Sequence, residues 1–174
     1  MRGQRDNEEQ DARYGRAAAA HGAAIERLAR GYEADAELRR DLVQDVHVAL
    51  WRSFAAYDGR CSERTWVYRV AHNAAADHVR ARRGSRLVDL ADAGELPAPG
   101  DPEAETDERR TAARLAALIQ QLKPADRQVM LLYLDDLGAA EIGEVTGLSA
   151  GAVAVRIHRI KALLARQFAM KETP

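Results

Sequence analysis

The segment 84–106 constrains the fold of this chain more than any other part of the sequence. It mixes prolines and glycines with carboxylates, and Arg86 is its only basic residue. Proline interrupts helices and strands, and like charges repel each other, so a segment of this composition extends as a linker. The sequence predicts an acidic linker at 84–106 between two small domains, 16–83 and 107–170, preceded by a flexible N-terminus at 1–15. A passive tether and a functional connector both fit this composition.

Both domains are predicted to be α-helical. Alanine, leucine and arginine are abundant, whereas the β-branched and aromatic clusters that are typical of strands are sparse. Similar apolar periodicities predict helices at 16–32, 62–83, 107–122, 139–146 and 150–168, and a further helix that begins at Pro124. The clearest case is 37–54, where apolar residues recur every four positions and define one buried side of a helix: Leu38, Leu42, Val46, Leu50 and Phe54. The predicted fold class is therefore all-α.

The charge of the chain is balanced overall. The formal net charge is -1 and the pI is near 6.5, so any binding of a polyanion must come from local basic patches. A single cysteine, Cys61, excludes an internal disulfide framework, and its activation as a redox sensor has no support in the sequence. Without a secretory leader or a long apolar run, the chain is expected in the cytosol, with no direct insertion into a membrane.

The helix at 37–54 carries a mixed polar face opposite its apolar side. Its residues are Arg40, Asp41, Gln44, Asp45, His47 and Arg52. Such a face is explained most simply by solvation, and docking on a larger protein is the alternative.

The stretch 57–83 has the features of a nucleic-acid surface. Asp58-Gly59 predicts a turn, and Ser62 is suited to cap the helix that follows. Arginines can neutralise phosphates and an asparagine can pair with a base edge, and such residues share one stripe of this helix: Arg69, Asn73, Ala76, Arg80 and Arg83. The aromatic residues Tyr57, Trp66 and Tyr68 could support an unstacked base. A core position is the alternative for Trp66.

The C-terminal domain is predicted to contain a helix-turn-helix. A short helix at 139–146 is followed by the turn Gly147-Leu148-Ser149 and by a longer helix at 150–168, and Gly143 lies where two crossed helices approach closely. The longer helix is expected to bury Val153, Ile157, Ile160 and Leu164. Its early face offers groups that suit guanine edges, thymine methyls and phosphates, namely Ala152, Val155, Arg156 and Arg159, with Lys161 and Arg166 beyond. A plain amphipathic helix of a bundle is the structural alternative.

Two sets of motifs resemble the extracytoplasmic-function (ECF) group of sigma-70-type RNA polymerase sigma factors, in that family's order. The first resembles sigma region 2: Asp41-Leu42-Val43-Gln44-Asp45, Leu50-Trp51-Arg52, the run from Thr65 to Asn73, and Asp77. The second resembles sigma domain 4: Leu122-Lys123-Pro124 through Tyr133, Glu141-Ile142-Gly143, Gly147-Leu148-Ser149, Val153, and the run from Arg156 to Lys161. Ala139 and Ala154 depart from the family's usual capping serine and basic residue.

The resemblance implies a role for each motif. Docking on core RNA polymerase would involve Asp41, Gln44, Asp45, Trp51 and Arg52. Recognition of the promoter's minus-ten element, with a flipped-out base in the loop 57–64, would involve Tyr57, Arg60, Ser62, Arg64, Trp66, Arg69, Asn73, Arg80 and Arg83. Recognition of the minus-thirty-five element would involve Ser149, Ala152, Val155, Arg156, Arg159 and Lys161. The implied partners are core RNA polymerase, promoter DNA and an anti-sigma factor, and no cofactor is implied.

Two other classes of protein are alternatives to the sigma factor. A response-regulator-type transcription factor also has a C-terminal helix-turn-helix, but residues 1–83 show neither strand alternation nor a phosphoacceptor pattern. A metal enzyme is disfavoured because His72 and His78 are six residues apart and so face different sides of one helix. There is no glycine-rich phosphate loop or nucleophile elbow, so no catalytic activity is expected.

Overall fold

The computed structural model describes residues 2–86 and 107–170, with side chains from 7–82 and 109–169. The described chain is all-helical: no strand occurs within these ranges, which confirms the predicted fold class. The helices are α1 (Arg2–Tyr32), α2 (Ala36–Ser53), the short 3-10 turn η1 (Phe54–Ala56), α3 (Glu63–Arg86), α4 (Asp107–Gln120), α5 (Pro124–Leu134), α6 (Ala139–Thr146) and α7 (Ala150–Met170). The predicted linker lies outside the described residues, apart from 84–86, which continue α3.

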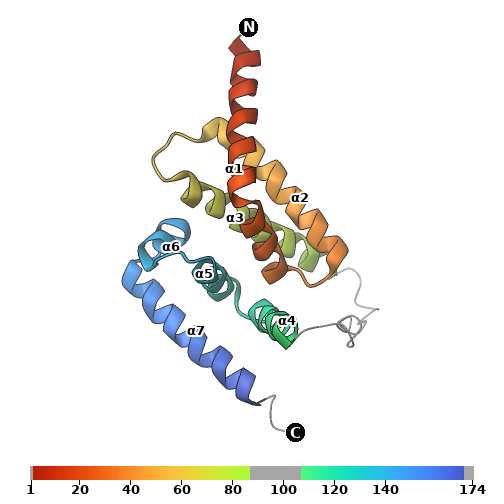
Figure 1. The fold of residues 1–174 in the computed structure, drawn as a ribbon, viewed down its shortest axis with the longest axis vertical. Helices are drawn as coiled ribbons and strands as arrows, with labels where there is room; N and C mark the ends of the chain where they lie inside the picture. The colour runs from red at the N-terminus through yellow and green to blue at the C-terminus, as the bar shows by residue number, and fades with distance from the viewer. Residues whose placement is uncertain (1, 87–106, 171–174) are drawn as a thin grey trace.

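Helices α1, α2 and α3 pack together as the N-terminal unit (Figure 1). The four-residue apolar pattern of α2 forms its centre, because Leu42, Val46 and Leu50 are fully buried. They pack with apolar residues from the two neighbouring helices, among them Ile25, Leu28, Val67 and Ala71. The sequence therefore identified the buried side of α2 correctly.

Helix α1 begins much earlier than the predicted start near Arg16. Its first turns run beyond the bundle in Figure 1, although residues 2–10 have no apolar periodicity. Polar side chains tie the following part of the helix to α2. Gln10 Nε2 donates to the carbonyl oxygen of Trp51 at 2.7 Å, and the hydroxyl of Tyr14 lies 3.1 Å from His47 Nδ1. These contacts are not visible in an apolar pattern, which explains the misplaced start.

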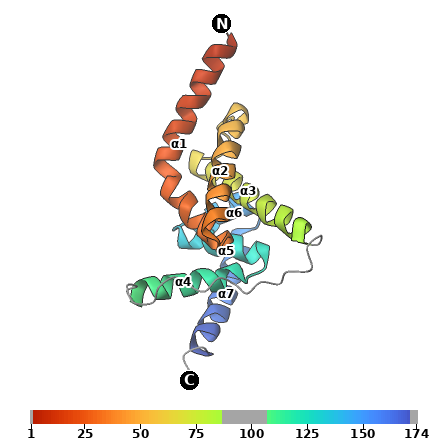
Figure 2. The same cartoon turned by 90° about the vertical axis from the view of Figure 1, so that its right-hand side faces the viewer.

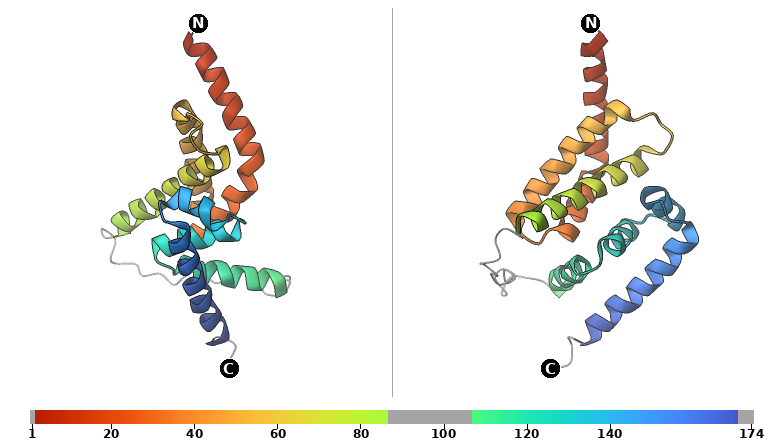
Figure 3. Two further views of the ribbon diagram at one scale, coloured as in Figure 1. Left: turned by 90° about the vertical axis from the view of Figure 1, so that its left-hand side faces the viewer. Right: turned by 180° about the vertical axis from the view of Figure 1, so that it is seen from behind.

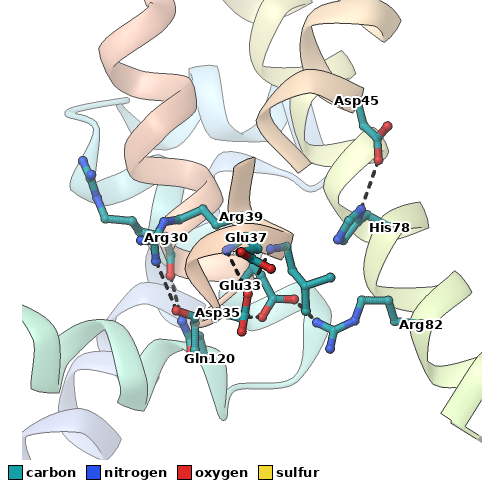
Figure 4. A network of polar contacts seen from close by, with 11 residues as sticks. Arg30, Glu33, Asp35, Glu37, Arg39, Asp45, His78, Arg82 and Gln120 are labelled. Atoms are coloured by element: carbon teal, nitrogen blue, oxygen red, sulfur yellow. Dashed lines mark hydrogen bonds and ion pairs between the residues drawn. The ribbon is translucent and has the colours of Figure 1, made fainter. Parts of the chain in front are cut away.

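The turn between α1 and α2 is held to α3 by a polar network (Figure 4). Asp35 caps α2 by accepting from the backbone N–H groups of Glu37 and Leu38 at 2.8 and 3.0 Å, and these bonds lower the pKa of the Asp35 carboxyl. The buried Glu33 carboxylate pairs with the guanidinium of Arg82, near the end of α3. The end of α3 is thereby fixed against the other two helices of the unit.

Helices α4 to α7 form the C-terminal unit, whose core includes Val129, Leu132, Ile142, Val153 and Ile160. In Figure 2, α4 runs crosswise to the long axis of the molecule, while α7 extends toward the C-terminal end. Pro124 occupies the first turn of α5, as predicted. Only the expected burial of Ile157 needs correction: it is half-buried, because it packs at the edge of the core and lines a surface pocket with Tyr133 and Ala139.

The two units pack against each other rather than standing apart (Figures 1 and 3). Gly31 of α1 permits close approach, because a Cβ atom there would lie 2.4 Å from Leu131 Cδ2 of α5. The buried guanidinium of Arg127 lies 5.4 Å from the centre of the Tyr32 ring, and it also donates to the carbonyl oxygen of Leu122. Gln120 Nε2 donates to the carbonyl oxygen of Arg30 at 2.7 Å. This arrangement determines which of the predicted binding residues are accessible.

Candidate polymerase and nucleic-acid interfaces

The residues expected to dock on polymerase share one exposed face of α2. All of them are exposed, and their spacing of three, four and seven positions places them on the same side of a helix: Asp41, Gln44, Asp45, Trp51 and Arg52. Val48 lies in the middle of this face and is 42% exposed. Sequence reasoning missed Val48 because an apolar residue on an amphipathic helix is normally assigned to the core. Its position three residues after Asp45 and four before Arg52 was the available signal.

The N-terminal part of α1 borders this face. Trp51 Nε1 donates to Asp11 Oδ1 at 2.7 Å, and the Trp51 side chain remains about one-third exposed. On the α3 side, Asp45 Oδ2 lies 3.1 Å from His78 Nδ1. The α2 face therefore combines carboxylates with two accessible apolar side chains, a composition suited to a protein partner.

The loop before α3 is shaped by a turn and a cap. Gly59 has a φ of 77°, the left-handed conformation that glycine adopts without strain, and the Asp58 carboxylate binds both the backbone N–H and the side chain of Arg60. Ser62 Oγ accepts from the backbone N–H of Thr65 at 3.0 Å, so Ser62 caps α3 as predicted. Arg60 in this loop and Ser62 at the start of α3 are both exposed.

Of the three predicted aromatic platforms, Tyr57 and Trp66 are half-buried and pack together, whereas Tyr68 is buried in the core. The ring centroids of Tyr57 and Trp66 lie 5.3 Å apart, and Trp66 Nε1 donates to Ser53 Oγ at 2.9 Å. The Tyr57 hydroxyl donates to the carbonyl oxygen of Cys61 at 2.8 Å. In this conformation the two rings support the loop. Trp66 therefore has a packing role, which was the alternative to support of an unstacked base.

The basic stripe of α3 is divided between solvent and the C-terminal unit. Asn73 and Arg80 are exposed, and Arg80 pairs with Asp77 at 2.5 Å. Arg64 and Arg69, by contrast, are half-buried and face the C-terminal unit. The side chain of Arg83 lies outside the described residues.

A buried histidine lies behind this stripe. His72 is 2% exposed, and its Nδ1 lies 3.0 Å from the hydroxyl of Tyr32. Burial lowers the pKa of His72 to about 3 and raises the pKa of Tyr32 to about 12. His72 is therefore neutral at physiological pH and has a structural role. Among the described residues, no group of histidine, cysteine and carboxylate side chains is arranged to hold a metal ion.

The helix-turn-helix geometry agrees with its sequence signature. Gly147 ends α6 with a φ of 79°, and Ser149 Oγ accepts from the backbone N–H of Ala152 at 3.2 Å at the start of α7. A Cβ atom at Gly143 would lie 2.6 Å from the carbonyl oxygen of Leu148. The predicted close approach at Gly143 is therefore confirmed.

The early face of α7 is open to solvent. Ala152 is exposed and Val155 is 72% exposed. Arg156 and Arg159 both pair with Asp126 of α5, at 3.5 and 3.0 Å. Lys161 Nζ lies 5.3 Å from the centre of the Tyr133 ring and 3.4 Å from its hydroxyl. Arg156 and Arg159 thus lie on one flank of α7, whereas Lys161, two residues after Arg159, lies on the other flank, and all three side chains contact α5.

Comparisons with known proteins identify the family. The family model "Sigma-70 region 2" matches residues 18–85, and "Sigma-70, region 4" matches residues 112–164. The chain is 33% identical over 164 residues to the RNA polymerase sigma factor CnrH of Cupriavidus metallidurans, covering 87% of this chain and 84% of that protein. It is also 28% identical to the ECF RNA polymerase sigma factor SigW of Bacillus subtilis, covering 73% of each protein. The chain belongs to the ECF sigma factors.

Solved structures of relatives have the same fold. CnrH, in complex with the cytosolic domain of CnrY, matches with a TM-score of 0.69 and 26% identity over 96% of this chain and 94% of that one. RpoE of Bartonella quintana, in complex with the anti-sigma factor NepR, matches with a TM-score of 0.69 at 15% identity over 92% of this chain and 98% of that one. As a sigma factor, the chain acts in transcription initiation with core RNA polymerase and promoter DNA. The response-regulator alternative is not favoured.

Proposed function

We propose that this sigma factor holds core RNA polymerase through the exposed face of α2. The observation that carries the proposal is the uninterrupted accessibility of Asp41, Gln44, Asp45, Val48 and Trp51 along one side of a rigid helix. Arg52 extends the same face. An apolar centre with a polar rim is the usual anatomy of a protein interface.

A charge placed in the centre of this face tests the proposal. Val48→Lys should weaken the affinity for core polymerase by tenfold or more, because a buried unpaired ammonium costs about 2 kcal/mol or more at an interface. Ala23→Lys, at an exposed position of α1, is the matched control. Equal affinities of the two variants in a core-binding titration would contradict the assignment.

We propose that the loop 57–64 and α3 bind the minus-ten element and that α7 reads the minus-thirty-five element. Asn73 and Arg80 offer base-edge and phosphate contacts on α3, while Val155, Arg156 and Arg159 offer them on α7. The remaining assigned residues, Tyr57, Arg60, Ser62, Arg64, Trp66, Arg69 and Arg83 in the first site and Ser149, Ala152 and Lys161 in the second, support these contacts. Two weak sites on one chain reinforce each other when both are engaged.

The two DNA roles are separable by substitution. Asn73→Ala should change the preference among downstream promoter sequences while the affinity for core polymerase stays the same. Transcript profiles from a promoter library, compared between the wild type and this variant, give the answer. An identical profile would count against base reading by Asn73.

We also propose that an anti-sigma factor binds this protein, by analogy with the complex of RpoE with the anti-sigma factor NepR and that of CnrH with the cytosolic domain of CnrY. A candidate groove of about 680 Å³ lies between α1, α4 and α5. Leu28, Ala112, Ile119 and Leu134 contribute apolar lining, and arginines including Arg30 lie at its edge. An amphipathic helix with carboxylates would match this surface.

A substitution in this groove tests the proposal. Ile119 is buried, so the more exposed Leu134→Asp is the better test and should weaken binding of the cognate anti-sigma factor. Undiminished binding would refute this site.

The proposal includes no catalytic step and no cofactor: the polymerase performs the chemistry, and the sigma factor supplies promoter recognition. Its place of action is that of the polymerase, the bacterial cytoplasm. None of the described helices combines the length and apolar character that a membrane crossing requires.

A further inference from the structure

The N-terminal part of α1 is attached to the C-terminal half of α2 by polar side chains. Gln10 Nε2 donates to the carbonyl oxygen of Trp51 at 2.7 Å, and Asp11 Oδ1 accepts from Trp51 Nε1 at 2.7 Å. The hydroxyl of Tyr14 lies 3.1 Å from His47 Nδ1, and the two rings meet edge to face with their centroids 6.0 Å apart. These contacts reach two residues of α2 that lie one turn apart on the flank of the α2 face.

The contacts have different tasks. Gln10 binds one of the carbonyl groups that a helix end leaves without an α-helical partner, and Tyr14 packs ring against ring with His47. Both therefore attach one helix to the other. Asp11 differs from them, because its carboxylate binds the movable end of a side chain, the indole nitrogen of Trp51.

Trp51 is one of the two accessible apolar side chains of the α2 face. It is 37% exposed, and Val48, one turn earlier, is 42% exposed. A tryptophan side chain rotates about two bonds, so the ring of an exposed tryptophan can point in several directions. The hydrogen bond from Nε1 to Asp11 selects one of these directions.

We propose that Asp11 is a positioning residue for docking on core polymerase. Its carboxylate holds the Trp51 indole in the orientation that the polymerase binds, and Asp11 acts through Trp51 without touching the polymerase itself. The assignment rests on the proposed role of Trp51 in core binding, and it adds to that role a residue of another helix, 40 positions away in the chain.

The neighbouring contacts make this position effective. Asp11 is exposed, so water competes for its carboxylate, and a lone pair of groups at such a place would attract each other weakly. Gln10 and Tyr14 hold this part of α1 against α2, which keeps Asp11 Oδ1 within reach of Trp51 in the free protein. The indole is then ordered before the polymerase binds, and less side-chain entropy is lost on association.

Two substitutions of Asp11 test this role in a titration of the full chain with core polymerase. Asp11→Leu removes the acceptor and favours a helix more than aspartate does. It should weaken the affinity by about two- to tenfold, the range expected for one side chain that must be ordered on binding. Asp11→Asn retains an oxygen acceptor and should change the affinity by less than about twofold. Equal losses in the two variants would assign the effect to the charge and overturn the positioning role.

A double-mutant cycle tests whether Asp11 acts through Trp51. Trp51→Phe keeps an aromatic ring and removes the Nε1 donor. In that background Asp11→Leu should cause no further loss of core affinity, because no hydrogen bond to the indole remains. The same loss in both backgrounds would overturn the proposal.

The matched control for the lost charge is Glu8→Leu, at an exposed position of α1 one turn before Asp11. It makes the same change of charge on the same helix and should leave the affinity for core polymerase unchanged. A loss equal to that of Asp11→Leu would show a general effect of the charge of α1, which would also overturn the positioning role.

A spectrum of the free protein reports on the contact itself. The chain has two tryptophans, so a proton–nitrogen correlation NMR spectrum contains one indole signal for each, and Trp51→Phe identifies the signal of Trp51. Asp11→Leu should shift this signal, whereas that of Trp66, which donates to Ser53 Oγ, should stay in place. An unmoved Trp51 signal would overturn the proposed contact.

Trp51→Ala separates a failure of this inference from a failure of the function on which it rests. It should weaken core binding by about tenfold or more, as expected for an aromatic anchor of an interface. Wild-type affinity of Trp51→Ala would remove Trp51 from the docking face, and the role of Asp11 would fail with it. Weakened binding by Trp51→Ala together with wild-type affinity of Asp11→Leu would leave the docking face intact and overturn the role of Asp11 alone.

Discussion

Gly143→Ala is the sharpest test of the helix-turn-helix geometry. The added Cβ atom would lie 2.6 Å from the carbonyl oxygen of Leu148, so the backbone of the turn between α6 and α7 would have to move. Overpacking of this kind costs about 1–3 kcal/mol, and the higher helix propensity of alanine returns up to about 1 kcal/mol. Because the obstacle is backbone rather than the end of a flexible side chain, we expect a net loss of about 1–2 kcal/mol.

The matched control is Gly151→Ala on α7. No heavy atom lies within 4 Å of a Cβ atom at Gly151, so only the gain in helix propensity remains. For a domain of this size, about 1 kcal/mol shifts the Tm by roughly 4–8 °C. Differential scanning calorimetry of the full chain should show a lower Tm for the C-terminal transition of Gly143→Ala and an equal or higher one for Gly151→Ala. A rise in Tm for Gly143→Ala would refute the close approach.

Two further predictions concern single side chains. In the unfolded chain His72 binds a proton below pH 6.5, whereas in the folded chain it binds one only near pH 3. The free energy of unfolding is therefore highest above pH 6.5, and between pH 6.5 and pH 3 it falls by about 1.4 kcal/mol per pH unit. Urea unfolding should show this slope for the wild type and a smaller one for His72→Gln, and parallel slopes would contradict the buried neutral state. Arg159→Ala should weaken upstream duplex binding by about 1–3 kcal/mol if it contacts a base, whereas the exposed Arg166→Ala on the same helix should have little effect. Equal losses in fluorescence anisotropy titrations would remove Arg159 from the recognition face.

The elements with a strong local signal were predictable from the sequence. The apolar spacing of Leu42, Val46 and Leu50 specified the buried side of α2, and the glycines at 143 and 147 specified the helix-turn-helix. In both cases one local rule, either apolar periodicity or the steric freedom of glycine, determines the structure.

The features that the sequence missed depend on contacts between distant segments. The first turns of α1 lack an apolar period, and the following part is fixed to α2 by Gln10, Asp11 and Tyr14. The packing of the two units was equally invisible, because Arg64 and Arg69 bind backbone carbonyl oxygens, which every residue has. Val48 was overlooked because composition alone assigns an isolated valine to the core.

Reconstituted transcription tests the central claim most directly. Purified protein would be combined with core RNA polymerase and fragmented genomic DNA, and the 5′ ends of the transcripts would be mapped. The account predicts new start sites that follow a shared two-part upstream sequence, and their loss with Val48→Lys but not with Ala23→Lys. Start sites identical to those of core polymerase alone would contradict it.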